Sequence, residues 1–258
     1  MKINDQFFKV FDKTDWYLAG QLITEFSAEP LKSDGGDETP NVWAAELLIR
    51  LFEGDRFLSN GKFFPEICLD DRYPRITQQI IRLVKSHMEH DARVFPKRTF
   101  INITPTDLEI PETIGLIREL IESASQHGKI ISLEFSEIFT FGQLERNLAT
   151  SELLQSEGAL LGLDDFGTGV LTSENVSNFP FDFVKADRSL CCSVEATQNP
   201  LHLELVKVAK AKGIMLIAEG IEETDVIGPL RALGYDYGQG YLFQMPAKLL
   251  EHMNGGTQ

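Results

Sequence analysis

Two adjacent carboxylates, Asp164 and Asp165, end an apolar run and precede a glycine-rich turn in the string ALLGLDDFGTG. Neighbouring carboxylates at the end of a buried strand repel each other, and such a pair usually persists with a cation or a proton to neutralise it. The pair therefore predicts a metal site. A helix-capping aspartate followed by an aspartate in a turn is the alternative interpretation.

Other short apolar runs also carry a single polar residue at or near their end. From Asn102 to Gln239 these residues follow one another at separations of 20 to 34 residues, about the length of one strand and its crossover helix. Because corresponding ends of parallel strands meet on one face of a barrel, we expect the side chains to converge. The set comprises Glu46, Asn102, Glu134, Asp164, Lys185, Glu219 and Gln239.

Carboxylates gathered in this way would repel one another at a cost of several kcal/mol unless cations compensate them. A ligand set made only of oxygen atoms, with an amide from Asn102, favours Mg²⁺, Mn²⁺ or Ca²⁺ over zinc or copper. Asp164 and Asp165 together suit a pair of cations of the kind that cleaves phosphoesters. Lys185 then adds a donor for the attacking water or for developing negative charge. A salt bridge from Lys185 to Asp187 or to one of the acids is the alternative.

The elements that must position these residues alternate along the chain. Helical periodicity follows Pro74, precedes Gly128 and follows Asn199 and Pro200, where it stops at Gly213. Strand and helix in repeated succession predict parallel strands in a single α/β domain. A closed barrel is favoured over a doubly wound sheet, because no GxGxxG string follows the first strand. The expected strands are residues 42–49, 99–104, 129–135, 159–164, 181–185, 214–220 and 237–243.

Composition limits the class of protein. The chain has 258 residues and a formal net charge of −15, which disfavours binding to DNA or RNA duplexes and to membrane surfaces. An anionic ligand could still bind where divalent cations fill an acidic pocket. Three cysteines without CxxC spacing argue against a disulfide framework or a thiolate metal site. No run is apolar enough to cross a bilayer. We expect a soluble, cytoplasmic protein.

The ordered motifs resemble those of the EAL-domain cyclic di-GMP phosphodiesterase family. Each string is weak alone, but the full order and spacing are specific, and the likeness covers nearly the whole chain. The name-giving motif has leucine in place of alanine at its middle position. The matching strings are ELLIR from Glu46 to Arg50, FINIT with Asn102, LEFSEI with Glu134 and Glu137, DDFGTG, FVKAD with Lys185 and Asp187, IAEGIE with Glu219 and Glu222, and QGY from Gln239.

The resemblance implies a fold and an assembly. It implies a modified TIM-like (βα)8 barrel whose first strand is antiparallel, in a single EAL domain. We expect that domain at residues 15–252, with an N-terminal extension at residues 1–14 and a C-terminal tail at residues 253–258. It also implies a homodimer, with a further protein partner possible.

The resemblance also implies a reaction, the in-line hydrolysis of one phosphodiester of cyclic di-GMP to linear pGpG with two Mg²⁺ or Mn²⁺ ions. Ca²⁺ is expected to inhibit, because its looser coordination fits a tight two-metal geometry less well. One metal would be bound by Glu46, Asn102, Glu134 and Asp164, and the other by Asp164, Asp165 and Glu219. Among the other residues, Lys185 would orient the water, Gln239 would support the network, Arg50 would meet a substrate phosphate, Glu137 would brace the loop after Asp165, and Glu222 would brace that loop or contact substrate.

Two departures bear on activity. Val170, Leu171, Thr172 and Ser173 replace the aromatic residue and two serines that usually follow DDFGTG, in a loop that couples dimerisation to metal binding in relatives. The Tyr-Gln-Pro element of the first strand aligns with Ala28, Glu29 and Pro30. The alternative is therefore that the chain is a catalytically silent EAL module, which binds cyclic di-GMP as a receptor or binds a protein partner such as a transcription regulator. A GGDE string at residues 35–38 resembles a cyclase signature, but its position favours a surface turn.

Overall fold

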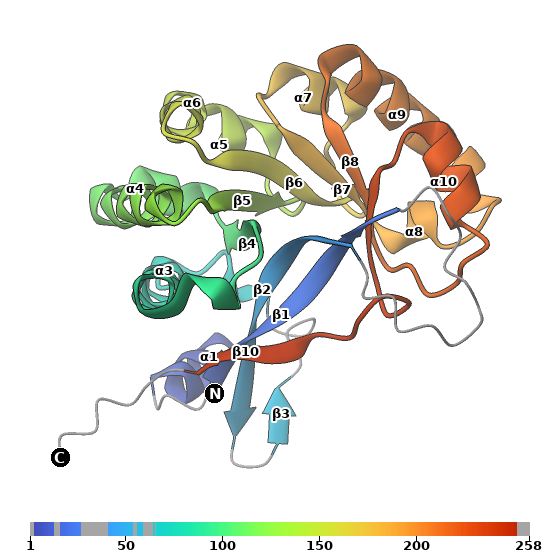
Figure 1. Ribbon diagram of the computed structural model, residues 1–258. Helices are drawn as coiled ribbons and strands as arrows, with labels where there is room; N and C mark the ends of the chain where they lie inside the picture. Colours follow the sequence, from blue (N-terminus) through green and yellow to red (C-terminus); the bar gives the residue numbers. More distant parts are fainter. Residues whose placement is uncertain are drawn as a thin grey trace, which may run out of the picture.

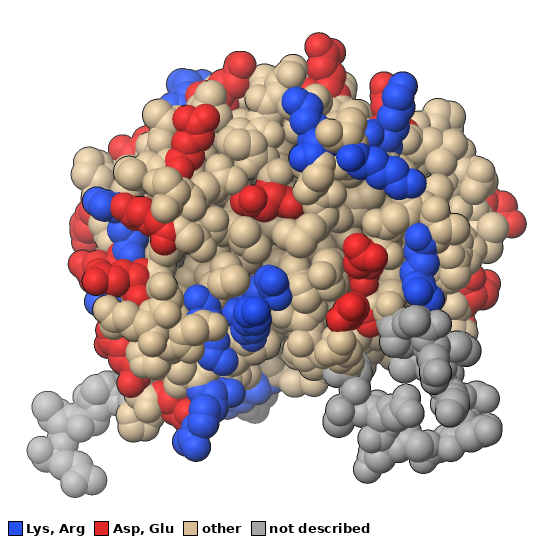
Figure 2. Space-filling model, turned by 45° about the horizontal axis from the view of Figure 1, so that its top comes forward, with Lys and Arg blue, Asp and Glu red and all other residues tan. Residues whose placement is uncertain are grey.

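The computed structural model describes residues 3–12, 16–26, 41–53, 56–58, 64 and 66–251. The Ala28-Glu29-Pro30 element, the GGDE string and the tail at residues 253–258 lie outside the described residues. None of the described helices is both long and apolar enough to span a membrane. Acidic and basic side chains are interspersed over the face shown in Figure 2, so the net charge is not gathered into one acidic field on that face.

The strands of the described chain form a closed barrel with two additional strands at its margin. The ten-stranded sheet closes through pairing of β1 with β2, which leaves β3 and β10 outside the ring. Pairing is parallel from β2 through β4 to β9, whereas β1 is antiparallel to both of its ring neighbours. The predicted barrel with an antiparallel first strand is confirmed. The strands are β1 Trp16–Glu25, β2 Val42–Glu53, β3 Arg56–Leu58, β4 Arg98–Ile103, β5 Ile130–Ser136, β6 Leu160–Phe166, β7 Phe183–Ala186, β8 Met215–Ala218, β9 Tyr237–Gln239 and β10 Ala247–Glu251.

Helices surround the barrel on the outside (Figure 1). The three predicted long helices are α3, α4 and α9, each with proline in its first turn, and α9 ends at Gly213 in the left-handed conformation. The helices are α1 Ile3–Phe11, α3 Pro74–Asp91, α4 Pro111–Gln126, α5 Phe141–Glu145, α6 Leu148–Ser156, α7 Ser173–Asn178, α8 Arg188–Cys191, α9 Pro200–Lys212 and α10 Ile227–Leu233, with 3₁₀ turns η1 Ala92–Val94, η2 Pro105–Glu109 and η3 Ala196–Gln198.

One strand was not expected, and another ends well before its apolar pattern does. β1 was not among the expected strands, and β9 ends at Gln239 although the apolar pattern continues to Phe243. The chain turns at Gly240, where a Cβ atom would lie 2.1 Å from the backbone oxygen of Ile221. The Ile221 backbone therefore leaves room only for glycine at this position, and the N–H groups of Phe243 and Gln244 donate to the Gly240 oxygen in the turn that follows β9.

The segment expected as an N-terminal extension contributes a packed helix. Phe7, Phe8 and Phe11 of α1 are buried, and the Phe11 ring stacks on Trp16 at 5.1 Å. Arg72 lies over the Phe8 ring and pairs with Asp70 and Asp5, which ties α1 to the chain before α3. The described part of this segment therefore belongs to the core of the domain.

The apolar core has two parts. The larger part contains the outward-facing strand residues and the helices packed on them. The smaller part contains Ile23, Ala44, Phe100, Phe183 and Ile217, together with Trp43. Side chains alternate between the two faces of a strand, so the residues two positions away from this smaller group also point into the barrel. These are the positions where the predicted polar residues lie.

Candidate active site

A polar layer lies directly above the apolar layer inside the barrel. On the parallel strands each polar residue comes two positions after an interior residue, so that Glu46 follows Ala44, Asn102 follows Phe100 and Lys185 follows Phe183. Pairing in register then aligns Asn102 with Glu134 on the adjacent strand. The structure thus brings together the predicted set of Glu46, Asn102, Glu134, Asp164, Asp165, Lys185, Glu219 and Gln239 at the carboxyl ends of the parallel strands.

Asp164 and Asp165 both face the site because the pairing of β6 with β7 is irregular at these two residues. Consecutive strand residues normally point to opposite faces, but β6 loses register with β7 between Leu163 and Phe166. Asp165 has φ of 59°, and it alone among the described non-glycine residues has positive φ. An aspartate tolerates this conformation better than most residues do. The local irregularity re-aims the Asp165 side chain toward the carboxylates that Asp164 also faces.

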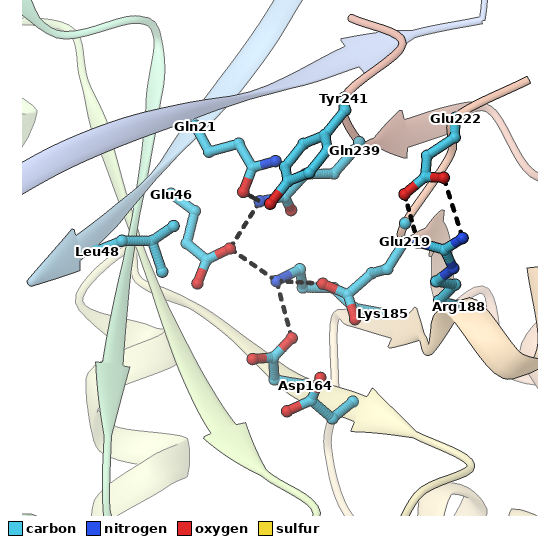
Figure 3. Close-up of a pocket in the computed structure, with 13 residues that line it drawn as sticks. Gln21, Glu46, Leu48, Asp164, Lys185, Arg188, Glu219, Glu222, Gln239 and Tyr241 are labelled. Carbon is cyan, nitrogen blue, oxygen red and sulfur yellow. Dashed lines mark hydrogen bonds and ion pairs between the residues drawn. The ribbon is translucent and has the colours of Figure 1, made fainter. Parts of the chain in front are cut away.

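Lys185 lies at the centre of the acidic residues and is buried (Figure 3). Its Nζ lies 2.8 Å from Asp164 Oδ1, 2.8 Å from Glu219 Oε1, 3.0 Å from Glu46 Oε2 and 3.4 Å from Glu134 Oε1. Burial opposes the charge, but these carboxylates hold the pKa of Lys185 well above its usual value. The lysine is therefore held as a cation by the carboxylates around it. The salt bridge considered in the sequence is present with several acids, whereas Asp187 caps α8 instead.

The carboxylates divide by their pKa values. Burial would raise the pKa of Glu46, but Lys185 and hydrogen bonds from Gln239 and Asn102 outweigh it and leave that pKa lowered. Desolvation raises the pKa of Asp164, and it holds the pKa values of Glu134 and Glu219 well above their usual range. Repulsion from the Asp164 carboxylate is the larger cause and burial the second, and together they raise the pKa of Asp165 to about 7. One ammonium group is too little charge to keep all these acids ionised.

The donor set fits divalent cations. Carboxylate oxygens of Glu46, Glu134 and Asp164 lie within 4.8 Å of one another, and so do those of Asp164, Asp165 and Glu219. Both oxygens of Glu134 are buried without a hydrogen-bond partner. When all are ionised, the five carboxylates and the Lys185 ammonium leave four negative charges uncompensated. Two divalent cations would balance these charges. Oxygen ligands of this kind suit Mg²⁺ or Mn²⁺.

Family membership is decided by the sequence profile of the EAL domain, which matches residues 36–246. The chain belongs to the EAL domain family. The profile begins after β1, yet β1 is needed to close the barrel of this EAL domain.

Curated relatives of this EAL domain include two bacterial proteins. The probable cyclic di-GMP phosphodiesterase PdeA of Escherichia coli K12 is 27% identical over 229 residues, which is 87% of this chain and 30% of the relative. The cyclic di-GMP phosphodiesterase NbdA of Pseudomonas aeruginosa is 28% identical over 154 residues, which is 59% of this chain and 20% of the relative. The chain spans less than a third of the length of either relative.

Solved structures share the fold of this EAL domain. The EAL enzyme Bd1971, in a form with cAMP and cyclic-di-GMP bound, superposes with a TM-score of 0.73 at 22% identity, over 96% of this chain and 66% of that one. The FimX EAL domain of Xanthomonas citri, in complex with c-diGMP, gives 0.73 at 18% identity, over 98% and 96% of the two chains.

Gln21 is a polar residue of the site that was not foreseen from the sequence. Gln21 in β1 lies opposite Glu46 in the strand register and lines the same pocket. Gln239 Nε2 donates to Gln21 Oε1 at 3.1 Å and to Glu46 Oε2 at 2.8 Å, while Asn102 Nδ2 donates to Glu46 Oε1 at 3.1 Å. Because β1 runs in the opposite direction, Gln21 precedes its apolar neighbour Ile23 instead of following it. That reversed order is the signal that would have identified it.

Glu137 contacts the loop that follows Asp165. Its carboxylate accepts N–H bonds from Gly167, Thr168 and Gly169 at 2.7–2.8 Å and from Leu171 at 3.1 Å. Gly169 allows this approach, since a Cβ atom there would lie 2.5 Å from the Glu137 backbone oxygen. In the altered part of the loop, Leu171 and Ser173 are buried, Val170 is exposed, and Thr172 caps α7.

The remaining predicted residues lie at the edge of the pocket, which has a volume of about 390 Å³. Glu222 lines it and pairs with Arg188. Arg50 is half-buried in β2, donates to the backbone oxygen of Ile49, and is not among the residues that line the pocket. Burial lowers the pKa of Arg50 against the opposing effect of Glu46. The ligand and substrate roles given to these residues remain predictions.

Proposed function

We propose that the chain hydrolyses cyclic di-GMP to linear pGpG with two bound divalent cations. One observation carries the proposal, namely the two oxygen clusters that share Asp164 around a buried lysine at the mouth of the barrel. Relatives named as cyclic di-GMP phosphodiesterases support the choice of substrate.

Two sets of residues would hold the cations. Glu46, Asn102, Glu134 and Asp164 are the proposed ligands of one, and Asp164, Asp165 and Glu219 those of the other. When bound, Mg²⁺ or Mn²⁺ supplies charge neutralisation of the phosphate, a lowered pKa for water and stabilisation of the leaving oxygen.

The protein's own groups would position the reactants. The neighbouring carboxylates hold the pKa of Lys185 well above its usual value, and we propose that its ammonium group donates a hydrogen bond to the attacking water. Gln239 fixes the carboxylate of Glu46 through its Nε2. Arg50 follows Glu46 on β2 and is proposed to reach a substrate phosphate. Glu137 is proposed to hold the loop after Asp165 in place.

The test is turnover of cyclic di-GMP followed by chromatography with Mg²⁺, Mn²⁺ or Ca²⁺. We expect linear pGpG with Mg²⁺ and Mn²⁺ and little product with Ca²⁺, which demands longer and looser coordination. Tight binding in calorimetry without pGpG under any of these ions would replace the proposal with a receptor function. Equal rates with Ca²⁺ and Mg²⁺ would remove the argument from coordination geometry.

A further inference from the structure

An ion pair between Arg188 and Glu222 lies at the edge of the pocket (Figure 3). Both terminal nitrogens of the guanidinium contact the carboxylate, and Nη2 lies 3.0 Å from Oε2. The side chains are 54% and 40% exposed, so the pair is open to a ligand in the pocket. Arg188 begins α8 soon after Lys185, and Glu222 follows Glu219, which places the pair beside the proposed cation ligands.

The backbone holds this pair in a defined position. Gly220 has φ of 62°, and a Cβ atom there would lie 2.5 Å from Arg188 Cβ and 2.7 Å from its Cγ. The aliphatic part of Arg188 therefore packs directly on the Gly220 backbone. The segment is also fixed to the chain after β9, because Ile221 donates to the Gln239 oxygen at 3.1 Å and Leu242 donates to the Ile221 oxygen at 3.0 Å.

Tyr241 completes this side of the pocket. It lies in the segment fixed to Ile221, lines the same pocket, and is 58% exposed. An aromatic ring that is open to solvent can stack on a nucleobase. An exposed tyrosine beside a polar pair of fixed geometry is a combination suited to binding a nucleobase.

The pair offers an acceptor and a donor side by side with no net charge. A carboxylate accepts from the N1–H and N2–H groups of guanine, and a guanidinium donates to its O6 and N7 atoms. Adenine has an amino group in place of O6 and an acceptor in place of N1–H, so both contacts would meet the wrong partner. A phosphate would gain little from this pair, because the carboxylate offsets the attraction of the guanidinium.

We propose that Arg188 and Glu222 act as one unit that selects guanine over adenine in the bound cyclic dinucleotide, with Tyr241 stacking on the same base. This inference rests on the proposed function, since it specifies how the same pocket recognises its substrate. It makes Arg188 a specificity-determining residue, which no motif in the sequence had indicated.

The test compares binding of cyclic di-GMP and cyclic di-AMP by calorimetry in the presence of Ca²⁺, and turnover of both with Mn²⁺. We expect the unaltered protein to prefer cyclic di-GMP by at least about tenfold. Arg188→Gln and Glu222→Gln should each reduce that ratio to near unity. The matched control is the exposed pair of Arg82 and Glu112, 2.8 Å apart between α3 and α4, where the same substitutions should leave the ratio unchanged.

A charge exchange separates recognition from bracing. Arg188→Glu combined with Glu222→Arg keeps an ion pair but reverses the order of donor and acceptor. We expect its thermal stability to exceed that of either single charge reversal while guanine preference stays lost. Recovery of guanine preference in the exchanged protein would mean that the pair only braces the loop, and would overturn the inference.

Other outcomes distinguish this inference from the proposed function. Selective binding of cyclic di-GMP that is unchanged in Arg188→Gln and Glu222→Gln overturns the inference alone. Selective binding that both substitutions remove, without turnover by the unaltered protein, supports the inference and contradicts the hydrolase proposal. Failure of both dinucleotides to bind contradicts both proposals.

Discussion

Two layers inside the barrel differ in chemistry although the same strands build them. The lower layer is apolar and the upper layer is charged, and only two residues, about 6.6 Å of strand, separate them. Phe183 and Lys185 on β7 illustrate the change, since both point inward and both are buried. On five strands of the ring the paired positions are Ile23 and Gln21, Ala44 and Glu46, Phe100 and Asn102, Phe183 and Lys185, and Ile217 and Glu219.

The difference teaches that stability and function come from separate layers. In the lower layer the Phe100 and Phe183 rings lie 4.7 Å apart, and Gly162 leaves the space that the Phe183 ring fills. In the upper layer burial and repulsion raise the pKa of most acids, which is a cost to the fold. The apolar layer therefore supports a polar layer whose buried acids cost stability, and the proposed cations would offset that cost.

The largest expected effect comes from removing the carboxylate shared by both proposed cation sites. Asp164→Ala should lower cyclic di-GMP turnover by at least about 10³-fold, because neither cation would keep its full ligand set. Circular dichroism should show a retained fold. Chromatography of the products measures the loss, with Glu112→Ala on the surface of α4 as the control. Near-normal turnover by the Asp164 variant would break the assignment of the upper layer.

The converse substitution is in the lower layer. Phe183→Ala should destabilise the protein by about 3–5 kcal/mol in urea unfolding, because it leaves a cavity in the barrel interior. The molecules that remain folded should still turn over substrate, since the carboxylates are retained. Gly162→Ala, whose Cβ would lie 1.9 Å from the Phe183 ring, should also destabilise, and less so when combined with Phe183→Leu. A stable Phe183→Ala protein would show that the two layers are not distinct in this way.

Much of this arrangement could be predicted because most strands carry the same local signal, a polar residue shortly after an apolar run. β1 escaped prediction because it is antiparallel, which reverses the order of Gln21 and Ile23, and because small residues interrupt its pattern at Ala19 and Gly20. The positive φ of Asp165 depends on how β6 pairs with β7, which no local pattern encodes. The Arg188–Glu222 pair likewise depends on two loops meeting in three dimensions.

Stability measured over a series of pH values compares the carboxylates of the upper layer with Asp107, a single buried acid outside that layer. Burial raises the pKa of Asp107 to about 6, so this carboxyl binds its proton more tightly in the folded protein. Its contribution, about 2–3 kcal/mol, is fully present below about pH 4 and is lost as the pH rises through about 6. Asp107→Asn should remove that part of the pH dependence in urea unfolding.

In EDTA the stability that the upper layer contributes should also fall as the pH rises, since the pKa of Asp165 is raised to about 7. The thermal midpoint should therefore fall further between pH 6 and pH 7.5 in EDTA. Mn²⁺ should reverse this second fall, because cations bind the ionised acids, and should leave the Asp107 component unchanged. Identical profiles in EDTA and Mn²⁺ would contradict a cation-dependent upper layer.

The smallest expected effect comes from Gln21. Gln21→Ala removes the acceptor for Gln239 Nε2 and should weaken apparent Mn²⁺ affinity and kcat/KM by about tenfold, because Gln239 orients Glu46. Fluorescence or calorimetric titration with Mn²⁺ measures the affinity. Glu25→Ala, at the exposed end of the same strand, is the control. A Gln21 variant with unchanged Mn²⁺ affinity would separate β1 from the polar layer.

Anomalous diffraction from crystals grown with Mn²⁺ tests the central claim most directly. The account predicts two manganese peaks in the upper layer. One should lie among Glu46, Glu134 and Asp164, and the other among Asp164, Asp165 and Glu219. Crystals without a manganese peak among these oxygens, at metal concentrations that saturate activity or stability, would contradict it.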